Sequence, residues 1–285
     1  MRIPLWAMLF ATLSVIPASA ETLTELGRKT HYHGIAFARS GTATLMIATH
    51  HGLYAIDKDA TVTRVSPVQD FMGFSPDPAN ELGYFASGHP ATGGNSGFLR
   101  SLDGGASWTQ LSPGVNGPVD FHQMDVSGAD PKVIYGSFGK IQVSRDGGAT
   151  WEIAGDAPER LIALAASSLQ PERLYAATEN GVLVSEDGAR SWAPLVFAGE
   201  VASTIQTGPD KALYAFVVGR GLMKASEDKP DSWSPLANDF GEAIPLHLAA
   251  NTKDGQQLAL TLQNNEVRES RDGGKSWRPF GQTSP

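Results

Sequence analysis

Short apolar and β-branched runs separated by turn residues recur along the whole chain, and residues 161–196 show the pattern most clearly. Four such runs occupy residues 161–166, 174–178, 182–185 and 192–196. Runs of about four to eight residues bounded by Gly, Pro, Asn, Asp or Ser are typical of β-strands. The pattern therefore predicts a four-stranded antiparallel sheet in this stretch.

The same pattern repeats at a nearly fixed period, marked by the octamer Ser-x-Asp-Gly-Gly-x-Ser/Thr-Trp. The octamer recurs, with small variations, at residues 101–108, 144–151, 185–192 and 270–277, and in a degraded form at 226–233. Its serines are 43, 41, 41 and 44 residues apart, which is the period of a four-stranded propeller blade and not of a helical repeat. One period earlier, residues 52–54 match residues 181–183, so there are six repeats. We therefore expect an all-β fold, a six-bladed β-propeller of four-stranded antiparallel blades.

The octamer is suited to a hairpin loop between two strands. In its last copy, Gly273 and Gly274 supply the positive φ of a tight turn, and the Asp272 carboxylate can accept turn N–H groups. Trp277 can then pack between neighbouring repeats. The octamer is similar to the Asp-box, or BNR, motif, and the resemblance to Asp-box propeller proteins covers nearly the whole chain after residue 30. The repetition of the octamer favours a structural over a catalytic role for it.

The first 20 residues have the pattern of a secretory signal peptide. Arg2 precedes an apolar run, and Ala18-Ser19-Ala20 forms a cleavage site. This run is shorter than the roughly 18–20 residues that a spanning helix needs, and no other apolar run is long enough. We therefore expect residues 1–20 to be removed and residues 21–285 to form one exported propeller domain, periplasmic or secreted. The sequence leaves open how the ring is closed, with residues 22–27 as one candidate latch.

Charge and cysteine content limit the possible partners. The chain has 22 basic and 30 acidic residues, a formal net charge of −8, and no cysteine. An acidic chain without basic runs argues against nucleic-acid and anionic-membrane partners. The lack of cysteine excludes thiol chemistry and thiolate metal sites. We expect a monomer without a nucleotide or organic cofactor.

Polar side chains replace apolar ones in half of the repeats. A separation of 17 residues links the start of the first strand to the end of the second strand in every repeat. In the last three repeats the first-strand position is apolar, as Ile162, Val201 and Leu246. In the first three repeats it is His33, Met72 and His122. This difference predicts a polar site on one half of the ring.

These polar residues are expected at one mouth of the central channel. Because the first strand begins and the second ends on the same rim, His33 should lie opposite His50, and Met72 opposite His89. The position two residues earlier holds His31, Asp70 or Asp120 and faces the same side. The predicted metal-ligand set comprises His31, His33, His50, His51, Met72, His89 and His122. His247 is one residue out of phase and is interpreted as an ordinary strand residue.

Such a cluster favours a transition-metal site. Neutral imidazoles and carboxylates bind Zn²⁺ and Cu²⁺, and the Met72 thioether favours copper. The structural alternative is a polar plug in which histidines pair with Asp70 and Asp120. Beside this mouth, the glycine-rich loop of residues 88–97 is a candidate lid or ligand contact.

The sequences around His50, Asp70, His89 and Asp120 resemble a group of exported bacterial Asp-box proteins labelled glycosyl hydrolase-like. The box is shared with sialidases and with sortilin-type propellers. The resemblance implies two further possibilities: a glycoside hydrolase with Asp70 and Asp120 as its catalytic carboxylates, or a protein-binding or assembly scaffold. A sialidase-type site would need an arginine cluster, which is not evident near the relevant rim.

Overall fold

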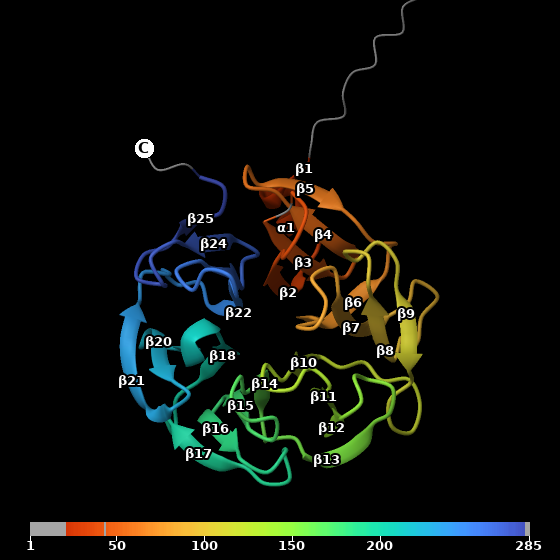
Figure 1. Cartoon of the computed structure of the whole chain (residues 1–285). Helices are drawn as coiled ribbons and strands as arrows, with labels where there is room; N and C mark the ends of the chain where they lie inside the picture. Colours follow the sequence, from red (N-terminus) through yellow and green to blue (C-terminus); the bar gives the residue numbers. More distant parts are fainter. Residues whose placement is uncertain (1–20, 43, 283–285) are drawn as a thin grey trace, which may run out of the picture.

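The computed structural model describes residues 21–42 and 44–282, and these residues form six antiparallel sheets arranged radially around a channel (Figure 1). The predicted six-bladed β-propeller is therefore confirmed. The predicted signal peptide, residues 1–20, lies outside the described residues. Within them, no helix has the length and apolar character needed to cross a membrane.

Each blade has four strands that follow one another outward from the channel. The blades consist of β2 (Tyr32–Phe37), β3 (Leu45–Thr49), β4 (Gly52–Ile56) and β5 (Thr61–Arg64); β6 (Asp70–Pro76), β7 (Tyr84–His89), β8 (Phe98–Ser101) and β9 (Thr109–Ser112); β10 (Gln123–Val126), β11 (Ile134–Phe138), β12 (Lys140–Ser144) and β13 (Glu152–Asp156); β14 (Leu161–Ala166), β15 (Leu174–Thr178), β16 (Gly181–Ser185) and β17 (Ala193–Val196); β18 (Ala202–Thr207), β19 (Ala212–Val217), β20 (Gly221–Ser226) and β21 (Lys229–Ala237); and β22 (Pro245–Ala250), β23 (Leu258–Leu262), β24 (Val267–Ser270) and β25 (Arg278–Pro279). A 3₁₀ turn, η1 (Pro209–Lys211), connects β18 to β19. The strands of blade four match the predicted runs to within one residue.

The octamers join the third strand of a blade to the fourth, as predicted. In blade two, Ser107 donates to the Asp103 carboxylate from its N–H, at 2.9 Å, and from its hydroxyl, at 2.5 Å. The same two bonds recur at Asp146, Asp187 and Asp272. Side-chain hydrogen bonds lower the pKa of these last three carboxyls to about 2. The octamer carboxylates are therefore occupied in holding turns.

A β-bulge near the start of the inner strand recurs in four blades. The bulged residues are His33, Ile162, Ser203 and Leu246. The alignment without gaps is thus wrong for blade five, where Ser203, and not Val201, is equivalent to His33. A bulge inserts one unpaired residue and redirects its side chain. The bulge also interrupts the period-two alternation of the strand. The prediction of which side chains point to the same side had relied on this alternation.

The N-terminal segment packs where the first and last blades meet. The short strand β1 (Glu21–Thr22) pairs with β5 at the outer edge of blade one, and α1 (Leu23–Lys29) follows it. Leu26 is buried in an apolar cluster that includes Val267 and Phe280 of blade six. Asn265 of blade six also donates to the Gly27 carbonyl at 2.8 Å. Among the described residues the ring is thus closed by this packing and not by a strand shared between the two blades.

Candidate metal centre at one mouth of the channel

Two histidines and a carboxylate meet where β2, β3 and β6 reach the same rim. His33 lies near the start of β2, His50 directly follows β3, and Asp70 opens β6. The two Nε2 atoms are 3.2 Å apart, and the rings are nearly perpendicular with centroids 4.0 Å apart. The predicted opposition of His33 and His50 is therefore confirmed.

The Asp70 carboxylate lies against the other nitrogen of both rings. His50 Nδ1 is 3.0 Å from Oδ2, and His33 Nδ1 is 3.1 Å from Oδ1. The first contact is a hydrogen bond. The second is close but poorly aligned, which leaves two buried atoms, His33 Nδ1 and Asp70 Oδ1, without a hydrogen-bond partner among the described residues. Burial raises the pKa of Asp70, but its interactions with His33 and His50 outweigh the effect of burial, and the net pKa is lowered. Asp70 is therefore an anion that orients the His50 ring and lies against the His33 ring.

This arrangement makes the space between the two Nε2 atoms electron-rich. A neutral imidazole carries one N–H, so a ring that directs its Nδ1–H at Asp70 has a lone pair on Nε2. His50 makes this hydrogen bond to Asp70 and so presents its Nε2 lone pair to Nε2 of His33, 3.2 Å away. The contact is favourable when Nε2 of His33 carries a proton, or when a metal ion lies between the two nitrogens. Among the described residues, His33, His50 and Asp70 form the one set of three or more His or acidic side chains with candidate ligand atoms all within 4.8 Å of one another.

Two further histidines surround this group at longer range. The rings of His31 and His51 lie 6.1 Å and 6.5 Å from the ring of His50. Both side chains are exposed. Among the described residues, neither side chain makes a hydrogen bond or an ion pair to the group.

Two of the remaining predicted residues, His89 and His122, form a second cluster around Asp120. His122 Nε2 is 2.7 Å, and His89 Nε2 3.2 Å, from Asp120 Oδ2. The Asp120 side chain is buried, and its Oδ1 has no hydrogen-bond partner in the part of the chain that the structure describes. His89 Nδ1 also lies 2.9 Å from the carbonyl of Gly94, in the loop of residues 88–97. Four of the seven predicted ligands thus fall into two His–Asp–His clusters.

The predicted opposition of Met72 and His89 is wrong. In the register of β6 and β7, His89 pairs with Asp70, and Met72 pairs with Ser87. The bulge of blade two falls between Met72 and Ser75, later than in blade one, so the inner strands of the two blades differ in register. Met72 is partly exposed.

His247, which the sequence analysis set aside, lines the same end of the channel. Together with His33 and His122 it borders a narrow cavity of about 70 Å³. The bulge at Leu246 places His247 there, and its Nε2 donates to the Tyr32 carbonyl at 3.1 Å. Burial lowers the pKa of His247 to about 4. A single-residue bulge carries no side-chain signature, so the sequence pattern did not reveal this position.

Replacing His247 by Gln is expected to remove part of the dependence of stability on pH. The pKa in the folded protein, about 4, is below the ordinary value of 6.5. The unfolded chain therefore binds a proton at higher pH than the folded chain, and the wild type loses stability as pH falls from 6.5 to 4, by at most about 3 kcal/mol. Urea unfolding at pH 7.5 and 4.5 measures the loss. An equal loss in wild type and His247→Gln would contradict this role.

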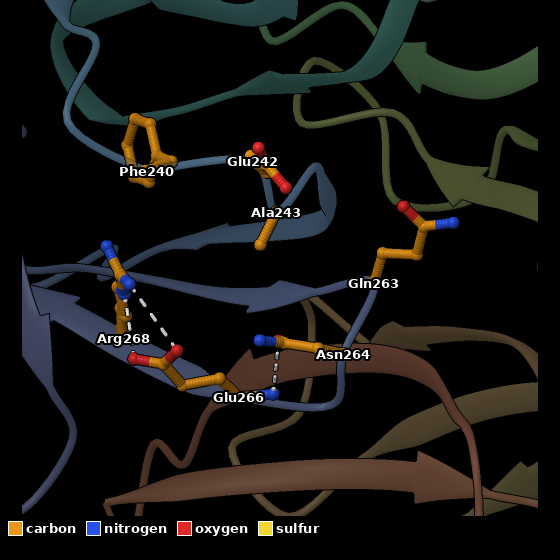
Figure 2. Close-up of a pocket in the computed structure, with 7 residues that line it drawn as sticks. All are labelled: Phe240, Glu242, Ala243, Gln263, Asn264, Glu266 and Arg268. Atoms are coloured by element: carbon orange, nitrogen blue, oxygen red, sulfur yellow. Dashed lines mark hydrogen bonds and ion pairs between the residues drawn. The ribbon is translucent and has the colours of Figure 1, made fainter.

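A wider, open pocket on blade six is built from other residues. Figure 2 shows Phe240, Glu242 and Gln263 around it, with the Arg268–Glu266 ion pair, 2.9 Å long, at one side. Its volume is about 570 Å³. Neither His–Asp–His cluster contributes a residue to this pocket. The pocket is therefore separate from the candidate metal centre.

Comparisons with known proteins show the fold. A scan against models of protein families finds no match, and neither does a sequence search of curated proteins. A GH74 enzyme from Niastella koreensis superposes with a TM-score of 0.62 and 14% identity, covering 88% of this chain and 45% of that one. YCF48 bound to D1 peptide gives 0.55 and 19%, covering 88% and 81%, and a putative gluconolactonase gives 0.64 and 11%, covering 88% and 90%. At these identities the likeness establishes the β-propeller alone, and the chain spans less than half of the GH74 enzyme.

Proposed function

We propose that the protein binds a Zn²⁺ or Cu²⁺ ion between Nε2 of His33 and Nε2 of His50. The main support for this proposal is that these two nitrogens are 3.2 Å apart while Asp70 lies against both Nδ1 atoms. Zinc binds His nitrogen at about 2.0–2.1 Å in tetrahedral geometry, which separates two such nitrogens by roughly 3.3 Å. The observed separation suits two ligands of one ion.

Asp70 would support the ion from behind the two rings. A metal-bound imidazole usually donates its other N–H to a carboxylate, which fixes the tautomer and makes the ligand nitrogen more basic. His31 and His51 are candidates for further ligands. Copper is expected to bind more tightly than zinc, because affinity for nitrogen and oxygen ligands follows that order. We further propose that the chain is an exported Asp-box protein, in keeping with residues 1–20 and with the octamers.

Metal content tests the proposal on the wild-type protein. Tag-free protein purified without chelator is expected to contain close to one equivalent of copper or zinc by elemental analysis. After stripping, a hundredfold excess of Zn²⁺ over the dissociation constant should stabilise the fold by about 2.7 kcal/mol, because the unfolded chain lacks the site. A shared proton between the rings, the polar-plug alternative, predicts no metal and no shift in the unfolding midpoint.

Glycoside hydrolysis is the second candidate, supported by the likeness of the fold to a GH74 enzyme. It would use Asp70 and Asp120 as acid and base. Both carboxylates are within 3.2 Å of two histidines, an arrangement unlike a free carboxylate pair. Aryl glycosides, including sialosides, and xyloglucan test this candidate. Turnover abolished by Asp70→Asn and by Asp120→Asn would support it, and no turnover with or without metal would remove it.

A further inference from the structure

A second cavity lies at the opposite end of the channel. Its volume is about 470 Å³, within the usual range for small-molecule sites of about 300–1,000 Å³. It is lined where the inner strands of all six blades end, whereas the histidines lie where these strands begin. Much of its wall is apolar, with contributions from Phe37, Phe74, Met124, Leu164 and Leu248. Among the residues that the structure describes, no histidine lines this cavity, although it shares Phe74, Met124, Leu164 and Leu248 with the narrow cavity that His33 borders.

One side of this cavity carries a carboxylate without a cationic partner. Asp125 accepts hydrogen bonds from three uncharged donors, the N–H groups of Val126 and Ala166, both at 2.9 Å, and the Ser75 hydroxyl at 3.4 Å. Burial raises the pKa of Asp125 to about 6, and the nearby Glu227 carboxylate contributes to the rise. Buried charges in proteins are usually paired. This side of the cavity therefore favours a cation.

Another part of the wall carries the guanidinium of Arg39, which forms no ion pair with a described carboxylate. Arg39 Nη2 donates to the backbone carbonyls of Asn80 and Gly83. Its Nε is buried and has no hydrogen-bond partner among the described residues. A guanidinium in this position suits a ligand carboxylate, with which arginine forms strong charge-assisted bonds.

We infer that this cavity binds a short apolar peptide of about dipeptide size, with its ammonium group at Asp125 and its carboxylate at Arg39. The opposite charges suit the two ends of a zwitterion, and the apolar wall suits its side chains. A ligand with one charge would leave the other group of the wall unpaired, at a cost in affinity.

Calorimetric titration with leucyl-leucine tests this inference. Wild type is expected to bind it, and to bind its N-acetylated and C-amidated forms at least about tenfold more weakly. Asp125→Asn and Arg39→Gln should each weaken binding by a similar factor. Thr252 is exposed and lies at the edge of the cavity. Thr252→Trp should therefore block entry of the dipeptide without disturbing buried contacts. This variant tests the inference even if Asp125→Asn and Arg39→Gln fold poorly.

His50→Ala is the matched control, because it removes the metal centre and leaves this cavity unchanged. Unaltered dipeptide binding by His50→Ala supports a separate site. The inference is overturned if wild type does not bind leucyl-leucine, if the blocked forms bind equally well, or if Thr252→Trp has no effect. Equal loss of dipeptide binding in His50→Ala would also overturn it.

Discussion

His33→Ala and His50→Ala are each expected to lower the affinity for Cu²⁺ and Zn²⁺ by more than a hundredfold. Each removes one of two ligand nitrogens 3.2 Å apart. Loss of a residue that only supports a ligand typically costs 10–100-fold in affinity, which is the range expected for Asp70→Asn. Affinity should also fall in acid, because protons compete with the metal for the same nitrogens. Isothermal titration of stripped protein measures these values.

His247→Ala is the matched control for these variants. Its Nε2 already donates to the Tyr32 carbonyl, so its loss should leave metal affinity within about threefold of wild type. His122→Ala determines whether the cluster around Asp120 contributes to the same site. Weak binding that is indifferent to His33→Ala and His50→Ala would contradict the assignment of both ligands.

Trp151→Ala is expected to destabilise the protein by about 3–5 kcal/mol, the usual cost of truncating a packed tryptophan. Its ring lies 5.1 Å from the ring of Phe98 in blade two and 4.8 Å from the ring of Phe121. Its Nε1 donates to the Ser112 hydroxyl at 2.9 Å, also in blade two. The octamer tryptophan thus joins two adjacent blades, and its removal leaves a cavity between them.

Urea unfolding of wild type, Trp151→Ala and Trp151→Phe measures this cost. The Phe variant keeps most of the ring contacts and should lose less stability than the Ala variant. Metal affinity of the folded fraction should be unchanged, because the Trp151 ring packs against Phe98 and Phe121 and not against His33 or His50. A loss below about 1 kcal/mol for Trp151→Ala would show that the interface does not depend on this ring.

The fold was predictable because the same pattern repeats six times. Each octamer combines turn residues with a tryptophan, and its regular spacing defines four strands per blade. The helix α1 also had a sequence signal, since Thr22 and Glu25 form a capping box. How this helix packs between blades one and six depends on contacts more than 200 residues apart, such as Asn265 to Gly27, which no local pattern reveals.

The sequence was sufficient to predict that the histidines of the candidate site lie on one rim of the channel, but not how they group there. The spacing of 17 residues correctly placed His33 beside His50, because β2 and β3 are neighbours in one blade. It failed for Met72 and His89, because the bulge of blade two shifts the register. Whether histidines of different blades share one site depends on side-chain directions around the ring. The division into clusters around Asp70 and Asp120 therefore needed the structure.

A crystal structure of the zinc-soaked protein, with anomalous data collected on both sides of the zinc edge, tests the central claim most directly. We expect one strong anomalous peak about 2.0–2.1 Å from Nε2 of both His33 and His50, with Asp70 still against the Nδ1 atoms. A zinc ion bound only elsewhere, or no peak between rings that remain about 3.2 Å apart, would show that a proton and not a metal ion joins them.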